Sequence, residues 1–138
     1  MDVKTYKLKA RYYETDKMGI IHHSNYIRWF EEARVDALEQ IGLNYDKLEA
    51  MGIASPVLSV NCQYLHPVHF NDELEISLKF TNFTGARFEV IYEIKNITTG
   101  DICTKGSTTH GFIGENGRPI RLKKQFPEVF YVLNKYFS

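Results

Sequence analysis

The chain has 138 residues, 43% of them hydrophobic and 14% aromatic, and its 17 lysines and arginines balance 17 aspartates and glutamates. This length suits a single domain over residues 1–138, and the balanced charge argues against nucleic acid or an anionic membrane as the main partner. No apolar run approaches the roughly 18 residues of a membrane span. Because the start leads straight into an alternating pattern, we expect no signal peptide. Cys62 and Cys103 offer no disulfide framework, which is typical of a cytoplasmic protein.

The first predicted elements are a strand and a long helix. Apolar and polar residues alternate over positions 6–13, which predicts a half-buried β-strand. From Asn25 to Ile41 apolar residues recur at spacings of three and four, which predicts a helix with a broad, aromatic-rich face. Ser24 and Asn25 are favoured N-cap types. Arg28 and Glu32 are spaced to form an ion pair on the outer side of this helix.

The rest of the chain predicts a short helix, four strands and a last helix. Asn44 is expected to cap the short helix, and Pro127 stands where proline opens a helix. Alternating patterns predict strands over residues 58–64, 74–81, 88–94 and 102–113. The last strand is rich in small residues, which often mark the close approach of a helix or a ligand. This order predicts an α+β fold with an antiparallel sheet on one side of the long helix.

The connection between the first strand and the long helix carries the densest set of chemically useful residues. Asp16 supplies a carboxylate that could act as a general base on water or as a nucleophile. Gly19 follows in the same turn, where a residue without Cβ lets backbone or ligand approach closely. The helix start presents unpaired N–H groups that can stabilise a carbonyl oxygen gaining negative charge. An anion, a donor and a tight turn therefore lie close together.

Each of these residues also has a purely structural explanation. Asp16 could close the loop as an Asx-turn residue, and Gly19 by itself marks only a turn. His22 and His23 could form a metal pair, but adjacent side chains on an extended segment point opposite ways. They also lack the spacing of known zinc motifs. We therefore expect no metal site.

This connection resembles that of a known family. The motif consists of Asp16-x-x-Gly19, a hydrophobic pair, His23, and then Asn25-Tyr26 at the start of a long aromatic helix. It is similar to the hotdog-fold acyl-CoA thioesterases, and more narrowly to the branch of 4-hydroxybenzoyl-CoA thioesterase and YbgC. Two positions depart from that branch: His22 stands where many members carry an aromatic residue, and Glu14 where many carry Asp or Asn.

The resemblance implies a hotdog fold, in which an antiparallel sheet wraps around one long central helix. It also implies a homodimer, often assembled into a dimer of dimers, with active sites at the subunit interface. It makes Asp16 the catalytic carboxylate and gives the backbone N–H of His23 the task of polarising the thioester carbonyl. Substrate-binding roles are expected for Gly19, His22, Asn25 and Tyr26.

The expected reaction is hydrolysis of an acyl-CoA thioester to a carboxylic acid and coenzyme A. Coenzyme A is part of the substrate, so no bound cofactor is needed. One alternative is a hydroxyacyl-thioester dehydratase that pairs His23 with Glu31 or Glu32, and another is a non-catalytic acyl-thioester binding module. A basic cluster formed by Arg118, Arg121, Lys123 and Lys124 is either solvated surface or a contact for the coenzyme A phosphates.

Overall fold

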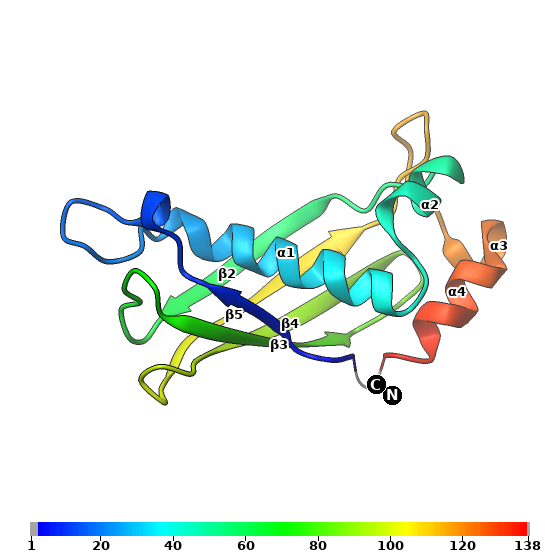
Figure 1. Cartoon of the computed structure of the whole chain (residues 1–138). Helices are drawn as coiled ribbons and strands as arrows, with labels where there is room; N and C mark the ends of the chain where they lie inside the picture. The colour runs from blue at the N-terminus through cyan, green and yellow to red at the C-terminus, as the bar shows by residue number, and fades with distance from the viewer. Residues whose placement is uncertain (1–2, 138) are drawn as a thin grey trace.

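A five-stranded antiparallel sheet wraps around one long helix in the computed structural model, which describes residues 3–137 (Figure 1). In chain order the elements are β1 (Tyr6–Lys9), η1 (Tyr12–Glu14), α1 (Ser24–Gln40), α2 (Tyr45–Ala50), β2 (Val57–Tyr64), β3 (Glu73–Thr81), β4 (Arg87–Asn96), β5 (Ile102–Gly111), α3 (Leu122–Gln125) and α4 (Pro127–Asn134). The strand order is β1-β3-β4-β5-β2, and every neighbouring pair is antiparallel. The predicted α+β fold, with a sheet wrapped around a central helix, is confirmed.

The core lies between α1 and the concave face of the sheet. Trp29 and Phe30 are fully buried on the inner face of α1, as the aromatic stripe predicts. The Phe30 ring stacks on Tyr92 of β4, with ring centroids 4.3 Å apart. It also lies against Gly106, where a Cβ atom would come within 2.6 Å of the ring. The small residues of β5 therefore mark the close approach of a helix, one of the two predicted possibilities.

Three local predictions need correction. The first strand ends at Lys9 instead of continuing to residue 13, because the Ala10 N–H donates to the carbonyl of Asp72 and the chain then turns into η1. The long helix begins at Ser24, with His23 rather than Ser24 or Asn25 as its N-cap residue. Glu32 pairs with Arg11, at 3.2 Å, rather than with Arg28.

The two edges of the sheet differ. The β1 edge is four residues long, whereas β2 presents eight residues whose side chains are exposed or half-exposed on both faces. Apolar side chains on β2 are exposed by 41–49%, namely Val57, Leu58, Val60 and Tyr64. An exposed apolar edge of this kind is a ready template for pairing with another strand. Among the described residues, no helix is long and apolar enough to cross a bilayer.

Candidate active site

A cavity of about 330 Å³ opens at the start of α1. The lining residues come from the loop before α1, from α1 itself and from the segment that follows β2: Asp16, Ile20, Ile21, His23, Tyr26, Tyr64, Leu65, His66 and Pro67. In Figure 1 the loop before α1 and the turn between β2 and β3 project from the same end of the molecule. Asp16 and His23, the N-cap residue of α1, therefore line the same cavity.

Asp16 lies in a tight turn and is partly buried. Its backbone N–H donates to the carbonyl of Ile20 at 2.8 Å, and its own carbonyl accepts from the N–H of Gly19 at 3.2 Å. Its side-chain Oδ1 accepts from the Met18 N–H at 2.8 Å, so the Asx-turn interaction considered for this residue is present. The second carboxylate oxygen, Oδ2, accepts no hydrogen bond from residues 3–137. Asp16 therefore closes its turn with one oxygen, keeps the other without a partner among the described residues, and lines the cavity.

Gly19 acts on this turn through its backbone. Its φ of +76° lies in the left-handed region, which residues with a Cβ atom adopt only at a cost of about 1–2 kcal/mol. A Cβ atom built on it would meet no atom within 4 Å, and Gly19 does not line the cavity. The residue sets the shape of the turn that holds Asp16.

The two adjacent histidines lie against each other instead of pointing opposite ways. Their ring centroids are 4.2 Å apart, because the chain leaves the extended conformation at His23, where φ is −56° and ψ −27°. The His22 Nδ1 accepts from the backbone N–H of Ser24 at 3.2 Å, so His22 binds one of the orphan donors of the helix start. Among residues 3–137 no group of three or more His, Cys, Asp or Glu side chains is arranged to hold a metal ion.

The N–H of His23 remains available for a ligand. In the described part of the chain, no acceptor lies within hydrogen-bonding geometry of this N–H, whereas its neighbours His22 and Asn25 both donate to carbonyls. His23 lines the cavity, and its N–H belongs to the N-terminus of a 17-residue helix. A helix N-terminus carries a partial positive charge, so the position favours an oxygen atom that gains negative charge.

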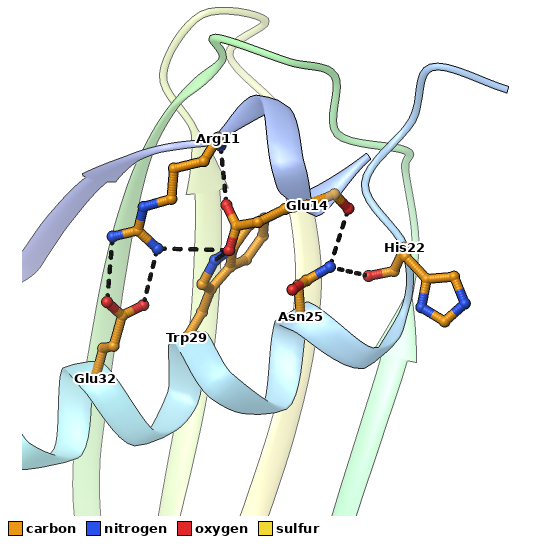
Figure 2. Close-up of polar contacts among 6 residues, drawn as sticks. All are labelled: Arg11, Glu14, His22, Asn25, Trp29 and Glu32. Atoms are coloured by element: carbon orange, nitrogen blue, oxygen red, sulfur yellow. Dashed lines mark hydrogen bonds and ion pairs between the residues drawn. The ribbon is translucent and has the colours of Figure 1, made fainter. Parts of the chain in front are cut away.

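Asn25 fastens the loop to the helix. Its buried side-chain amide donates to the carbonyl of Glu14 at 3.0 Å and to that of His22 at 3.2 Å, as Figure 2 shows. The backbone N–H of His22 donates to the same Glu14 carbonyl at 2.9 Å. Asn25 does not line the cavity, so within this chain its side chain positions the loop.

Glu14 completes this attachment from the other side. Its side chain is only 3% exposed; Oε1 accepts from the backbone N–H of Arg11 at 2.9 Å, and Oε2 accepts from the indole N–H of Trp29 at 2.8 Å. The Arg11 guanidinium bridges Glu14 and Glu32 (Figure 2). A buried carboxylate needs such partners, and here they tie η1 to the outer side of α1.

The opposite wall of the cavity is fixed by its own hydrogen bonds. The Ile21 N–H donates to the carbonyl of Val68 at 2.8 Å and joins the two walls. Buried Asp72 accepts through Oδ2 from the N–H of His69 and from the side-chain amide of Asn96, both at 2.9 Å. The segment after β2 is thereby held against both the loop and the sheet.

Two tyrosines line the floor of the cavity. Tyr26 and Tyr64 meet edge to face, with ring centroids 5.0 Å apart, and the Tyr64 hydroxyl donates to the carbonyl of His23 at 3.2 Å. Burial raises the pKa of the Tyr26 hydroxyl well above its usual range. Burial, with a smaller effect from Cys62, raises the pKa of Tyr64 to about 12. Both hydroxyls therefore stay protonated near neutral pH and cannot serve as bases.

The carboxylates proposed for a dehydratase lie elsewhere. Glu31 and Glu32 line a separate cavity of about 590 Å³ on the outer side of α1, and His23 is not part of it. Glu32 is in addition paired with Arg11. Neither Asp16 nor His23 lines this larger cavity, whereas both line the smaller one, so the smaller one is the candidate active site.

Comparisons with known proteins identify the family of the chain. The chain matches the Thioesterase-like superfamily over residues 10–132. The solved structure of DHNA-CoA thioesterase from Staphylococcus aureus has a TM-score of 0.90 and 36% sequence identity, and the match covers 96% of this chain and 89% of that one. YneP of Bacillus subtilis is 31% identical over 129 residues, 93% of each chain. The acyl-CoA thioester hydrolase YbgC of Escherichia coli O157:H7 is 27% identical over 89 residues, which is 64% of this chain and 66% of that one. The chain therefore belongs to the thioesterase-like hotdog superfamily, and it is a thioesterase.

Proposed function

We propose that the cavity at the start of α1 hydrolyses an acyl-CoA thioester with Asp16 and the backbone N–H of His23 as its two catalytic groups. The observation that carries this proposal is that Asp16 and His23 line the same hollow, and that the N–H of His23 has no acceptor among residues 3–137. The thioester carbonyl oxygen accepts from the His23 N–H, and the carbonyl carbon then faces Asp16. No bound cofactor takes part, since coenzyme A arrives with the substrate.

Asp16 has two chemically complete ways to act. As a general base it takes a proton from a water molecule, whose oxygen adds to the carbonyl carbon. As a nucleophile its oxygen attacks that carbon, the C–S bond breaks with its electron pair going to the sulfur of coenzyme A, and water then hydrolyses the resulting anhydride to the free acid and the Asp16 carboxylate. In both routes the charge that develops on the carbonyl oxygen is stabilised by the His23 N–H, a kind of contribution worth about a hundredfold or more in rate.

Asp16→Asn tests the carboxylate without disturbing the turn. The amide oxygen of an asparagine can still accept from the Met18 N–H, so the Asx turn persists. We expect kcat for acyl-CoA hydrolysis to fall by about a hundredfold or more, with thermal unfolding unchanged. Asp101→Asn, in the exposed turn between β4 and β5, is the matched control. An Asp16→Asn variant that keeps nearly the full rate of thiol release refutes the role of Asp16.

The acyl group is to be identified with the same assay. The named relatives include both an acyl-CoA thioester hydrolase and a DHNA-CoA thioesterase, so the panel contains short, long and aromatic acyl-CoAs together with one acyl-carrier-protein thioester. Release of free thiol identifies the preferred substrate class.

We further propose that the enzyme works as a homodimer that pairs along β2. The strand is an open edge with exposed apolar side chains on the helix-facing side, and the cavity residues Tyr64 and Leu65 lie at one end of it. A second copy on this edge would cover those side chains and stand beside the cavity. A dimer of dimers would need a further contact surface.

The dimer is tested by placing a charge on the open edge. Val60→Lys is expected to convert the dimer to a monomer in sedimentation and to lower the rate of hydrolysis. Ile91→Lys is the matched control, since Ile91 is also an exposed apolar residue, 46% accessible, but on the inner strand β4. A Val60→Lys protein that sediments as the wild type would contradict pairing along β2.

A further inference from the structure

His66 is a second histidine in the wall of the cavity, and no task has so far been given to it. It lies two residues after the end of β2 and lines the cavity together with Asp16 and His23. Its backbone is held firmly, because the N–H groups of Leu65 and His66 both donate to the carbonyl of Cys103, at 2.9 and 3.1 Å. Pro67 then restricts the chain on the other side. The imidazole is therefore attached to a fixed part of the wall.

The imidazole of His66 is a proton donor of the cavity that no other described side chain engages. Within residues 3–137 neither its ring nor that of His23 makes a hydrogen bond, but the His23 ring packs against His22 and also meets Tyr64 edge to face, with the His23 and Tyr64 centroids 6.3 Å apart. Tyr26 and Tyr64 are poor acids near neutral pH because burial raises the pKa of both hydroxyls. Asp16 is occupied with water or with the carbonyl carbon.

We propose that His66 is a further catalytic residue, which protonates the sulfur atom as the thiol leaves. This inference rests on the proposed thioester hydrolysis at the same cavity. After water or Asp16 has added to the carbonyl carbon, the C–S bond breaks and its electron pair goes to sulfur. The imidazolium of His66 gives its N–H proton to that sulfur, so coenzyme A departs as the neutral thiol. The neutral ring then takes a proton from solvent, and the proton that came from water leaves through Asp16 to solvent.

The relative acidities of an imidazolium and a thiol suit this proton transfer. An alkyl thiol ordinarily has a pKa near 8.5 and an imidazolium near 6.5, so the proton moves to the stronger base once the C–S bond breaks. Asp16 is the one carboxylate in the lining, and the other titratable groups there are His23, Tyr26 and Tyr64. We expect hydrolysis to slow as pH rises through the range in which histidines lose their proton.

The test compares two leaving groups on the same acyl group. The acyl group preferred in the coenzyme A panel is supplied once as its coenzyme A thioester and once as its S-phenyl thioester, whose aryl thiol is more acidic and leaves without a proton. For His66→Gln we expect kcat to fall about tenfold or more with the coenzyme A thioester and less than threefold with the S-phenyl thioester. The fall of wild-type kcat at alkaline pH should be absent from the variant.

His69→Gln is the matched control, because His69 is, like His66, an exposed histidine, lies three residues further on and does not line the cavity. It should behave as wild type with both thioesters. Equal losses with both thioesters in His66→Gln, or no loss with either, would overturn the proposal. Thermal unfolding of His66→Gln verifies that the variant is folded. If the wild type releases no thiol, or Asp16→Asn keeps its rate, the proposed function itself has failed, which is a different result.

Discussion

Acid should destabilise this protein strongly through one histidine in its core. His110 of β5 is fully buried; its Nε2 shares a hydrogen bond with the Thr108 hydroxyl at 2.7 Å, and its ring stacks on Phe88. Among the described residues Nδ1 has no partner of ordinary hydrogen-bond geometry, although the Ser55 backbone favours the charged ring. Burial, reinforced by the positive charge of Arg34, lowers the pKa of His110 from 6.5 to about 4.

The size of the effect follows from this pKa. Between pH 6.5 and 4 the unfolded chain binds a proton at residue 110 that the native protein does not bind, so the free energy of unfolding rises with pH. At 1.36 kcal/mol per pH unit, a gap of about 2.5 units corresponds to about 3 kcal/mol. This stability is present above pH 6.5 and is lost as the pH falls to 4.

The assay is urea unfolding at a series of pH values for three proteins. His110→Gln removes the titrating group. When the pH is lowered from 7.5 to 3.5, the unfolding free energy of the wild type should therefore fall by about 3 kcal/mol more than that of the variant. Thr108→Val removes the hydrogen bond but keeps the histidine, so it should retain the wild-type pH dependence. A His110→Gln protein with the full wild-type slope would refute the assignment.

Four further substitutions test the packing and the loop. Asn25→Ala removes two hydrogen bonds to the loop; we expect about 2 kcal/mol less unfolding free energy and a fall in kcat, whereas an unchanged kcat would show that the loop needs no such attachment. Gly106→Ala brings a Cβ atom within 2.6 Å of the Asn61 carbonyl oxygen and should cost about 3 kcal/mol, measured by urea unfolding. In Gly19→Ala the added Cβ atom meets no other atom within 4 Å, but residue 19 must keep its positive φ. Thermal unfolding should therefore show a loss of only about 1 kcal/mol in the free energy of unfolding. Asn44→Ala removes the acceptor for the Lys47 N–H at the start of α2, and its cost should be about 1 kcal/mol.

Periodicity in the sequence was sufficient for most of the fold. The long helix and the four later strands lie within one or two residues of their predicted bounds, because each buries one face and so repeats at 3.6 or 2 residues. The first strand was overestimated for a tertiary reason. Residues 10–13 continue the alternating pattern, but hydrogen bonds with Asn71 and Asp72 turn the chain away from the sheet at Ala10.

The supports of the active site were harder to predict. Glu14 stands in the sequence as one polar residue of the connection after the predicted strand, yet its partner is the indole of Trp29, fifteen residues later. Asp72 is held by Asn96, twenty-four residues away. His66 follows a strand like any surface residue. Local sequence contains no signal for contacts between residues so far apart in the chain. The motif around Asp16 could therefore be found in the sequence, whereas the side chains that hold the loop and the opposite wall of the cavity could not.

The contacts that hold the opposite wall of the cavity determine when the cavity can form during synthesis on the ribosome. Leu65 and His66 are anchored to Cys103, and Asp72 to Asn96, so the motif emerges long before the strands that complete its pocket. A nascent chain arrested ahead of β5 would carry Asp16 and its helix without a formed pocket. Binding of an acyl-CoA should therefore begin only when β5 has cleared the exit tunnel, late in synthesis.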